Sequence, residues 1–315
     1  MTPLDGPVLV TGAAGFAGSH LVELLSQRGY SPTGWMRPGA IPPRGLPPID
    51  WQAVDVLDAG TMTRTIGSLR PAVVFHCAGA AHVARSWSEA RSTLEQNALG
   101  THHLLNALRA AGLHARVLIP GSSMVYGPAD NAIGENHPLA PASPYGLSKL
   151  AQEMLGQRSI QEDRQQVLLT RSFNHTGPRQ DPSYAAPGFA RQIALIEAGR
   201  RAPVIDVGNL EASRDLTDVR DTVRAYLDIV EKGRPGVIYN VCSGRAHKIG
   251  DVLNGLIAHS RMPVEIRVDP SHYRPDDMPL SLGDGRRIER DVGWRPVIPF
   301  GQMLADLLDY WRTAI

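Results

Sequence analysis

Two side chains that could exchange protons stand four residues apart, Tyr145 and Lys149, in the segment Ser143-Pro-Tyr-Gly-Leu-Ser-Lys149. Residues at i and i+4 share one helix face, so the lysine ammonium would lie near the phenol and favour its deprotonated form. A free phenol has a pKa of about 10 and exchanges protons near neutrality only with such help. The same spacing also arises by chance on surface helices, so the pair alone does not establish catalysis.

Three glycines near the start of the chain, Gly12, Gly15 and Gly18, give a second chemical signal. The first permits a tight turn, the second lets the backbone approach a pyrophosphate, and the third lets a helix pack close to a strand. Free N–H groups at the start of that helix would hold the phosphates. Because a strand pattern precedes the glycines and a helix pattern follows them, they predict a dinucleotide site that also includes Ala14 and Phe16.

The end of the next strand-like run, Gly34-Trp-Met-Arg37, bears on the type of dinucleotide. Sites that prefer NAD carry Asp or Glu there, whereas Arg37 could clamp a 2′-phosphate. NADP(H) is therefore favoured, and NAD(H) stays open because Arg37 could equally be a solvated loop residue. Asp55, with Val56 beside it, is expected to accept from the adenine amino group or else to cap the following helix.

Small residues and a serine end the two following apolar runs. The first run ends in Ala78, Gly79 and Ala80, which would let the backbone lie along the cofactor ribose, although plain packing explains them as well. The second ends at Ser122, whose hydroxyl could hydrogen-bond the substrate oxygen that Tyr145 protonates. All these groups must therefore meet at one edge of the fold.

The pattern of elements supplies such an edge. Apolar runs rich in β-formers alternate with helix-length segments, which predicts an α/β fold, a doubly wound parallel sheet of the Rossmann type. Ligands bind at the carboxyl ends of its strands. A proline-rich surface loop is expected over 37–48, and helices over 17–27, 61–68, 93–111, 188–199, 249–260 and 301–311.

The alternation loosens after residue 173, as it would in a smaller, discontinuous lobe. We expect residues 1–173 plus about 215–242 to form the NADP(H)-binding domain. The remainder, about 174–214 plus 243–315, would form a substrate-binding lobe.

Composition excludes several classes of function. The 315 residues are 43% hydrophobic and 20% charged with a net charge of +1, so no global field favours nucleic acid or a membrane surface. Cys77 and Cys242 lie far apart in apolar runs and are expected to be buried, reduced thiols. No ligand spacing predicts a metal, and neither a basic leader nor a long apolar run is evident, so a cytoplasmic protein is expected.

The chain resembles the extended short-chain dehydrogenase/reductases, in the nucleotide-sugar epimerase/dehydratase group. The resemblance runs from the first strand to the last helix and is carried by residues 11–20, 97–101, 122–127, 143–149 and 171–178. Later segments are most similar to GDP-4-dehydro-6-deoxy-mannose reductases, namely 172–180, 207–221, 239–244, 272–275 and 293–296.

The resemblance implies roles for particular residues. Ser122, Tyr145 and Lys149 fall on the family's catalytic triad, and Phe173 and His175 on cofactor contacts. It also implies a GDP-sugar substrate and a homodimer formed through helices near 93–111 and 147–158. The substrate contacts that it implies are Ser123, Met124, Asn174, Arg191, Arg214 and Arg274.

Met124 separates the members of the group. Its dehydratases carry an acidic residue at this position, two residues after the triad Ser/Thr, and a thioether cannot take a proton. Reduction of a 4-keto sugar needs only hydride, a proton donor and a group that holds the oxygen. A reductase is therefore favoured; a 4-epimerase with retained NAD, a dehydratase, or a regulator that kept the fold without the chemistry are the alternatives. The exact sugar and nucleotide stay open.

Overall fold

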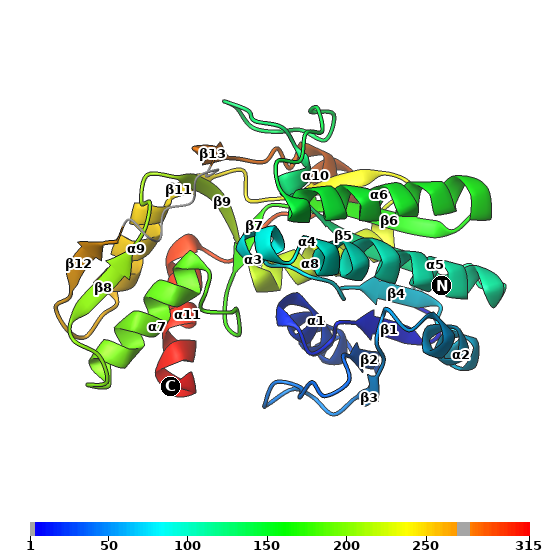
Figure 1. The fold of residues 1–315 in the computed structure, drawn as a ribbon, viewed down its shortest axis with the longest axis horizontal. Helices are drawn as coiled ribbons and strands as arrows, with labels where there is room; N and C mark the ends of the chain where they lie inside the picture. The colour runs from blue at the N-terminus through cyan, green and yellow to red at the C-terminus, as the bar shows by residue number, and fades with distance from the viewer. Residues whose placement is uncertain (1–3, 270–277) are drawn as a thin grey trace.

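A seven-stranded parallel sheet forms the larger half of the molecule (Figure 1) in the computed structural model, which describes residues 4–269 and 278–315. The strand order is β10-β6-β5-β4-β1-β2-β3. The chain builds outward from β1 to β3 and then crosses to β4, so the order reverses between β1 and β4, where such sheets bind ligands. The strands are β1 (Val8–Thr11), β2 (Thr33–Met36), β3 (Asp50–Ala53), β4 (Val73–His76), β5 (Arg116–Ser122), β6 (Gln166–Ser172) and β10 (Ile238–Val241).

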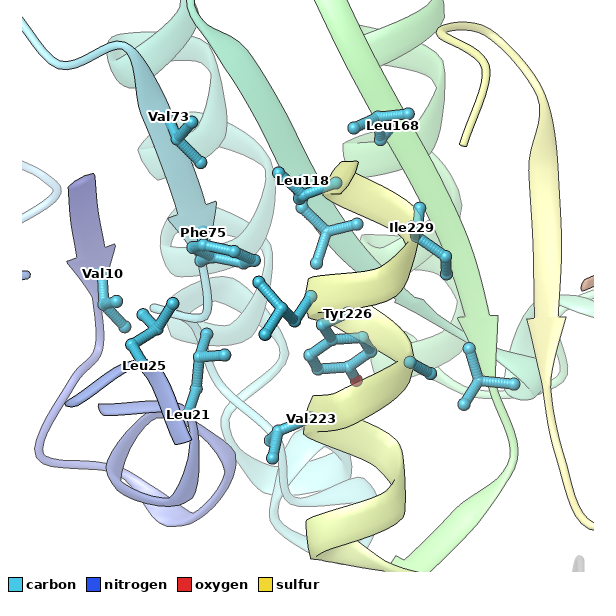
Figure 2. Close-up of a cluster of buried hydrophobic side chains, with 14 of the residues drawn as sticks. Val10, Leu21, Leu25, Val73, Phe75, Leu118, Leu168, Val223, Tyr226 and Ile229 are labelled. Carbon is cyan, nitrogen blue, oxygen red and sulfur yellow. The ribbon is translucent and has the colours of Figure 1, made fainter. Parts of the chain in front are cut away.

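Helices cover both faces of this sheet, which confirms the predicted doubly wound fold. Side chains alternate between the faces along each strand, so Val10 and Phe75 pack with α1 (Phe16–Gln27) and α8 (Val219–Lys232). Figure 2 shows this core, with Tyr226 of α8 among the strand side chains. Leu9 and its neighbours face the other way, toward α2 (Ala59–Leu69), α5 (Gly100–Ala110) and α6 (Pro144–Asp163).

In the described part of the chain, the smaller half carries two short sheets and three helices. β8 (Val204–Val207) pairs with β12 (Glu265–Val268). A second sheet has the order β11-β9-β13, and β7 (Asn174–Thr176) also pairs with β9. Its core is made by α7 (Ala185–Glu197), α9 (Ile249–Ala258) and α11 (Phe300–Ala314). The sheet strands are β9 (Ser213–Asp218), β11 (Ala246–Lys248) and β13 (Leu280–Ser281).

Two predicted helices differ from the structure. The segment 93–111 is not one α-helix: α4 (Ala90–Leu94) leads into a π-helical turn, Glu95–Leu99, before α5 begins. The second, α7, starts at Ala185 instead of residue 188, because Pro187 falls in the first turn, where its missing N–H is not needed. The remaining predicted helices are present with ends that move by a few residues, and 37–48 is irregular as expected.

Two elements also lie elsewhere than the expected lobe division places them. β9 belongs to the small second sheet, so the return to the large sheet begins with α8 at Val219 and not at residue 215. The helix α10 (Arg286–Val292), assigned by sequence to the substrate lobe, packs its Ile288 and Val292 into the core beneath the large sheet. With these changes the two-lobe division remains our proposal.

Both cysteines are free thiols, Cys242 buried and Cys77 only half-buried. Among the described residues, no helix is long and apolar enough to cross a membrane.

Candidate active site

The first turn of α6, the helix that carries Tyr145, packs against the short turn that follows β5. Ser143 caps α6 by accepting from the Gly146 N–H, and Pro144 occupies the first turn. A Cβ on Gly146 would lie 2.4 Å from the carbonyl oxygen of Met124, so only glycine allows this approach. The Tyr145 N–H donates to Ser86 Oγ at 3.2 Å. The start of α6 is thus fixed against the end of β5.

Tyr145 and Ser122 form one hydrogen-bonded pair. Burial raises the pKa of Tyr145 above its usual 10.0, and the hydrogen bond with Ser122 acts in the opposite direction. Ser122 ends β5 and also accepts from the Met124 N–H at 3.2 Å. The phenol is therefore protonated at neutral pH and can give a proton to an oxygen bound beside Ser122.

Lys149 lies one turn along the same helix. Its ammonium donates to the Pro120 carbonyl at 2.7 Å and to Gln152 Oε1 at 2.6 Å, and burial lowers its pKa to about 8. The raised pKa of Tyr145 has burial as its main cause. That Lys149 eases deprotonation of the phenol stays a prediction.

The glycine turn has the shape that a pyrophosphate requires. Gly12 has φ 64°, and a Cβ there would lie 2.7 Å from the Ala78 backbone. A Cβ on Gly18 would lie 2.2 Å from the Gly12 carbonyl oxygen, so the first turn of α1 packs directly against the glycine turn. Gly15 is the N-cap of α1 and supplies no side-chain cap. The first N–H groups of the helix therefore remain available to an anion.

Asn97 was missed as a site residue, although it lies in a segment that resembles the family. Its Oδ1 accepts from the Ala80 N–H at 2.8 Å, and its Nδ2 donates to the Ala80 carbonyl and to Ser148 Oγ. Gly79 has φ 152°, and a Cβ there would lie 2.3 Å from Asn97 Oδ1. Asn97 sits in the π-helical turn and ties the Ala78–Gly79–Ala80 segment to α6.

The residues predicted to contact the adenosine end lie at the sheet edge. Arg37 is exposed just after β2. Asp55 is exposed and accepts from the Leu57 N–H at 2.9 Å, whereas Asp58 caps α2. The Phe16 ring stacks on His175 with centroids 5.7 Å apart, and Phe173 is buried.

A cleft of about 580 Å³ is lined by Asn174 and by residues of α7 and β8. Arg214 also lines it and donates to the Ser213 and Met278 carbonyls. Three predicted contacts lie outside the lining: Ser123 is buried, Met124 is half-buried, and Arg191 lies over the Trp311 ring at 5.9 Å. Gln192, the next residue of α7, lines the cleft instead, because helix residues one apart face different ways. Arg274 lies outside the described residues.

Comparison with known proteins agrees with this geometry. The family model described as GDP-mannose 4,6 dehydratase matches residues 9–307. The chain belongs to this family. The resemblance seen in the sequence is thereby confirmed.

A curated relative and a solved structure are both similar to this chain over nearly its whole length. The GDP-6-deoxy-D-mannose reductase of Pseudomonas aeruginosa is 34% identical over 311 residues, which cover 98% of each chain. The solved structure of RMD from Pseudomonas aeruginosa complexed with NADPH has a TM-score of 0.85 at 32% identity and covers 98% of this chain and 100% of its own.

A structure with a different activity is similar too. The UDP-glucose 4-epimerase of Thermus thermophilus, solved in complex with NAD, has a TM-score of 0.87 at 28% identity, covering 98% of this chain and 100% of its own. The fold alone therefore does not separate a reductase from an epimerase.

Proposed function

We propose that this member of the GDP-mannose 4,6-dehydratase family reduces the 4-keto group of a GDP-4-dehydro-6-deoxy-hexose with hydride from NAD(P)H, giving a GDP-rhamnose-type product. The observation that carries the proposal is Met124 beside an intact Tyr145–Ser122 pair. A dehydratase needs a base at that position, and the thioether of Met124 cannot act as a base at neutral pH. The similarity to a GDP-6-deoxy-D-mannose reductase over 98% of the chain supports the same activity.

In the proposed reaction a bound nicotinamide supplies the hydride. Ser122 holds the carbonyl oxygen, and Tyr145 gives that oxygen a proton as the new C–H bond forms at carbon 4. The phenolate left on Tyr145 is stabilised by the ammonium of Lys149 and takes its next proton from solvent. Lys149 carries its charge below a pKa of about 8, so turnover should fall as the pH rises beyond that value.

We infer that the phosphates of the cofactor are held by the glycine turn and its ribose by the segment 78–80. Asn174 and Arg214 are proposed to hold the sugar diphosphate, because both line the cleft and an arginine can bind a phosphate through two N–H groups.

The choice between nucleotides and between reactions needs a direct assay. Purified GDP-, UDP-, TDP- and CDP-linked 4-keto sugars would each be tested for net oxidation of NADPH. We expect turnover with the GDP-sugar. Interconversion of C4 epimers without any NADPH consumption would instead establish the 4-epimerase, which the likeness to UDP-glucose 4-epimerase favours as the second candidate.

Arg37 is proposed to select NADPH by binding its 2′-phosphate. Arg37→Ala should lower kcat/KM for NADPH roughly 10- to 100-fold, since charge-assisted hydrogen bonds contribute about 1.5–3 kcal/mol. The value for NADH should hardly change. Arg44→Ala is the matched control, an exposed arginine in the same loop. Equal losses with both cofactors would contradict the assignment.

A homodimer is proposed through α5 and α6, which lie side by side in Figure 1. Large apolar side chains on and beside these helices are exposed, among them Leu147 and Met154 of α6 and Leu99 just before α5. A second copy would cover them. Light scattering should give twice the chain mass of 34.1 kDa, and Met154→Glu should give a monomer. Met262→Glu, which changes another exposed methionine in the other lobe, should leave the mass unchanged.

A cytoplasmic location is also proposed. Two free cysteines and a nucleotide-linked substrate suit a reducing compartment where such substrates are made.

A further inference from the structure

A chain of buried polar side chains joins the glycine turn to Lys149. Thr11 ends β1, His76 ends β4, Thr101 belongs to α5 and Gln152 to α6, and none of the four is more than 1% exposed. Thr11 Oγ1 lies 2.9 Å from His76 Nδ1, and His76 Nε2 lies 3.0 Å from Thr101 Oγ1. Gln152 Nε2 lies 2.7 Å from the same Thr101 oxygen, and Gln152 Oε1 accepts from Lys149 at 2.6 Å.

The direction of every hydrogen bond follows from Thr101. Its single hydroxyl proton goes to the Asn97 carbonyl at 2.7 Å, so its oxygen can only accept from its other two neighbours. His76 must therefore donate from Nε2, and Gln152 must donate from Nε2. An amide turned the other way would set its oxygen against the Thr101 oxygen and its NH2 against the Lys149 ammonium.

The far end of the chain agrees with this assignment. With its proton on Nε2, His76 accepts at Nδ1 from the Thr11 hydroxyl, and Thr11 in turn accepts from the Ala78 N–H at 3.1 Å. Burial lowers the pKa of His76 to about 3, so the imidazole is neutral as the pattern requires. Because the chain ends at a backbone amide, it carries no proton to or from solvent. Its effect is to fix the orientation of the His76 imidazole and the Gln152 amide.

We propose that Gln152 is a positioning residue for Lys149, its amide oriented by Thr101 and His76 so that an oxygen always faces the ammonium. The proposal rests on the proposed function for what Lys149 does, but the placement of Lys149 is tested separately. The chain of hydrogen bonds also connects the glycine turn, through Thr11, to Lys149 on α6.

The Lys149 ammonium also donates to the Pro120 carbonyl at 2.7 Å, a backbone acceptor that does not titrate. The titratable groups nearby do not take the place of Gln152. His76 is neutral, and burial raises the pKa of Cys77, which follows β4, to about 12, so this thiol keeps its proton. Tyr145, one turn earlier on α6, is also protonated at neutral pH. Glu153, the next residue of α6, is bonded to Arg171.

The sequence offers a direct readout, because it contains only three lysines, Lys149, Lys232 and Lys248. Protein labelled with 13C at the lysine Cε would be titrated by NMR without cofactor or substrate, with the other two resonances as internal references. In Gln152→Met the pKa of Lys149 should fall by about 1 below that of the wild type, since a charged donor loses one of its two acceptors. Gln152→Glu keeps an acceptor and adds charge, so it should raise that pKa.

Gln165→Met is the matched control, a glutamine of similar burial just beyond α6 whose amide donates to the Leu113 carbonyl. It should leave the pKa of Lys149 unchanged. An unchanged pKa in folded Gln152→Met, or the same change in Gln165→Met, would overturn the proposal. If Gln152→Met does not fold, Gln152→Glu decides: no rise in the pKa of Lys149 overturns it.

Activity then separates this proposal from the proposed function. Gln152→Met should lower kcat about threefold at pH 7.5, because a pKa lower by about 1 reduces the charged fraction of Lys149, and should move the alkaline fall of kcat to lower pH. The KM for the sugar nucleotide should stay unchanged. A shifted lysine pKa in a protein that reduces no 4-keto sugar would refute the proposed function and leave the positioning role standing. Full kcat with an unshifted pH profile in Gln152→Met would refute the positioning role alone.

Discussion

Replacing Tyr145 with phenylalanine should lower kcat by about 100- to 10,000-fold, the range that general acid catalysis contributes. The variant removes only the hydroxyl and keeps the ring that packs beside Ser122, so the fold and the glycine turn should be unaffected. The measurement is single-turnover reduction of the 4-keto sugar nucleotide, with thermal unfolding recorded on the same preparation.

Tyr126→Phe is the control for loss of a buried tyrosine hydroxyl. Tyr126 is 2% exposed and donates to Asn240 at 2.7 Å, close to the site but pointed into the core. It should lose about 1 kcal/mol of stability and keep its turnover. Full turnover in folded Tyr145→Phe would mean that another group gives the proton.

Replacing Glu153 with alanine should reduce the free energy of unfolding by about 3–5 kcal/mol, because it leaves the Arg171 guanidinium buried without its counter-charge. The two side chains are each 3% exposed and meet through two hydrogen bonds of 2.8 and 2.7 Å. Arg171 also donates to the Glu135 carbonyl and lies 4.8 Å from the centre of the Tyr126 ring. Equilibrium unfolding in urea would measure the change.

An exposed pair on the same helix provides the comparison. Glu162 bonds to Arg158 at 3.0 Å, with both side chains more than 40% exposed. Glu162→Ala should cost less than about 1 kcal/mol, because water screens the pair. Similar losses for the two variants would show that burial is not what makes the Glu153–Arg171 pair important.

The parts of the site that the sequence predicts are those whose signal is local. Gly12, Gly15 and Gly18 reveal a turn because Gly12 has a positive φ and a side chain at Gly18 would strike the Gly12 carbonyl. Tyr145 and Lys149 share a face because helix geometry fixes the distance between i and i+4. The strand ends converge because parallel strands point the same way.

What the sequence does not predict depends on neighbours that are distant along the chain. Gln152 has no local feature that distinguishes it from Gln157 on the same helix; only the packing of α5 and β4 brings Thr101 and His76 to it. The π-helical turn is invisible because the segment has an ordinary helical composition, and it is the contact with Ala80 that gives Asn97 its place. The resemblance implies Arg191 as a substrate contact, yet the facing of α7 puts Gln192 in the cleft lining.

Burial also bears on the electrostatics of the pair. Desolvation raises the pKa of the Tyr145 phenol, and Lys149 donates to the Pro120 carbonyl and to Gln152. A phenol that keeps its proton suits a proton donor better than a base. The reductive direction is thus consistent with the geometry as well as with Met124.

The central claim is that hydride passes from an external dinucleotide to carbon 4 of the sugar. The most direct test supplies NADPH deuterated at the transferable position of nicotinamide carbon 4, together with a GDP-4-dehydro-6-deoxy-hexose, and analyses the product by NMR and mass spectrometry. We predict one deuterium per product molecule, at carbon 4, with one NADPH oxidised for each. Product formed without deuterium and without net loss of NADPH would contradict the claim and establish chemistry on a retained cofactor.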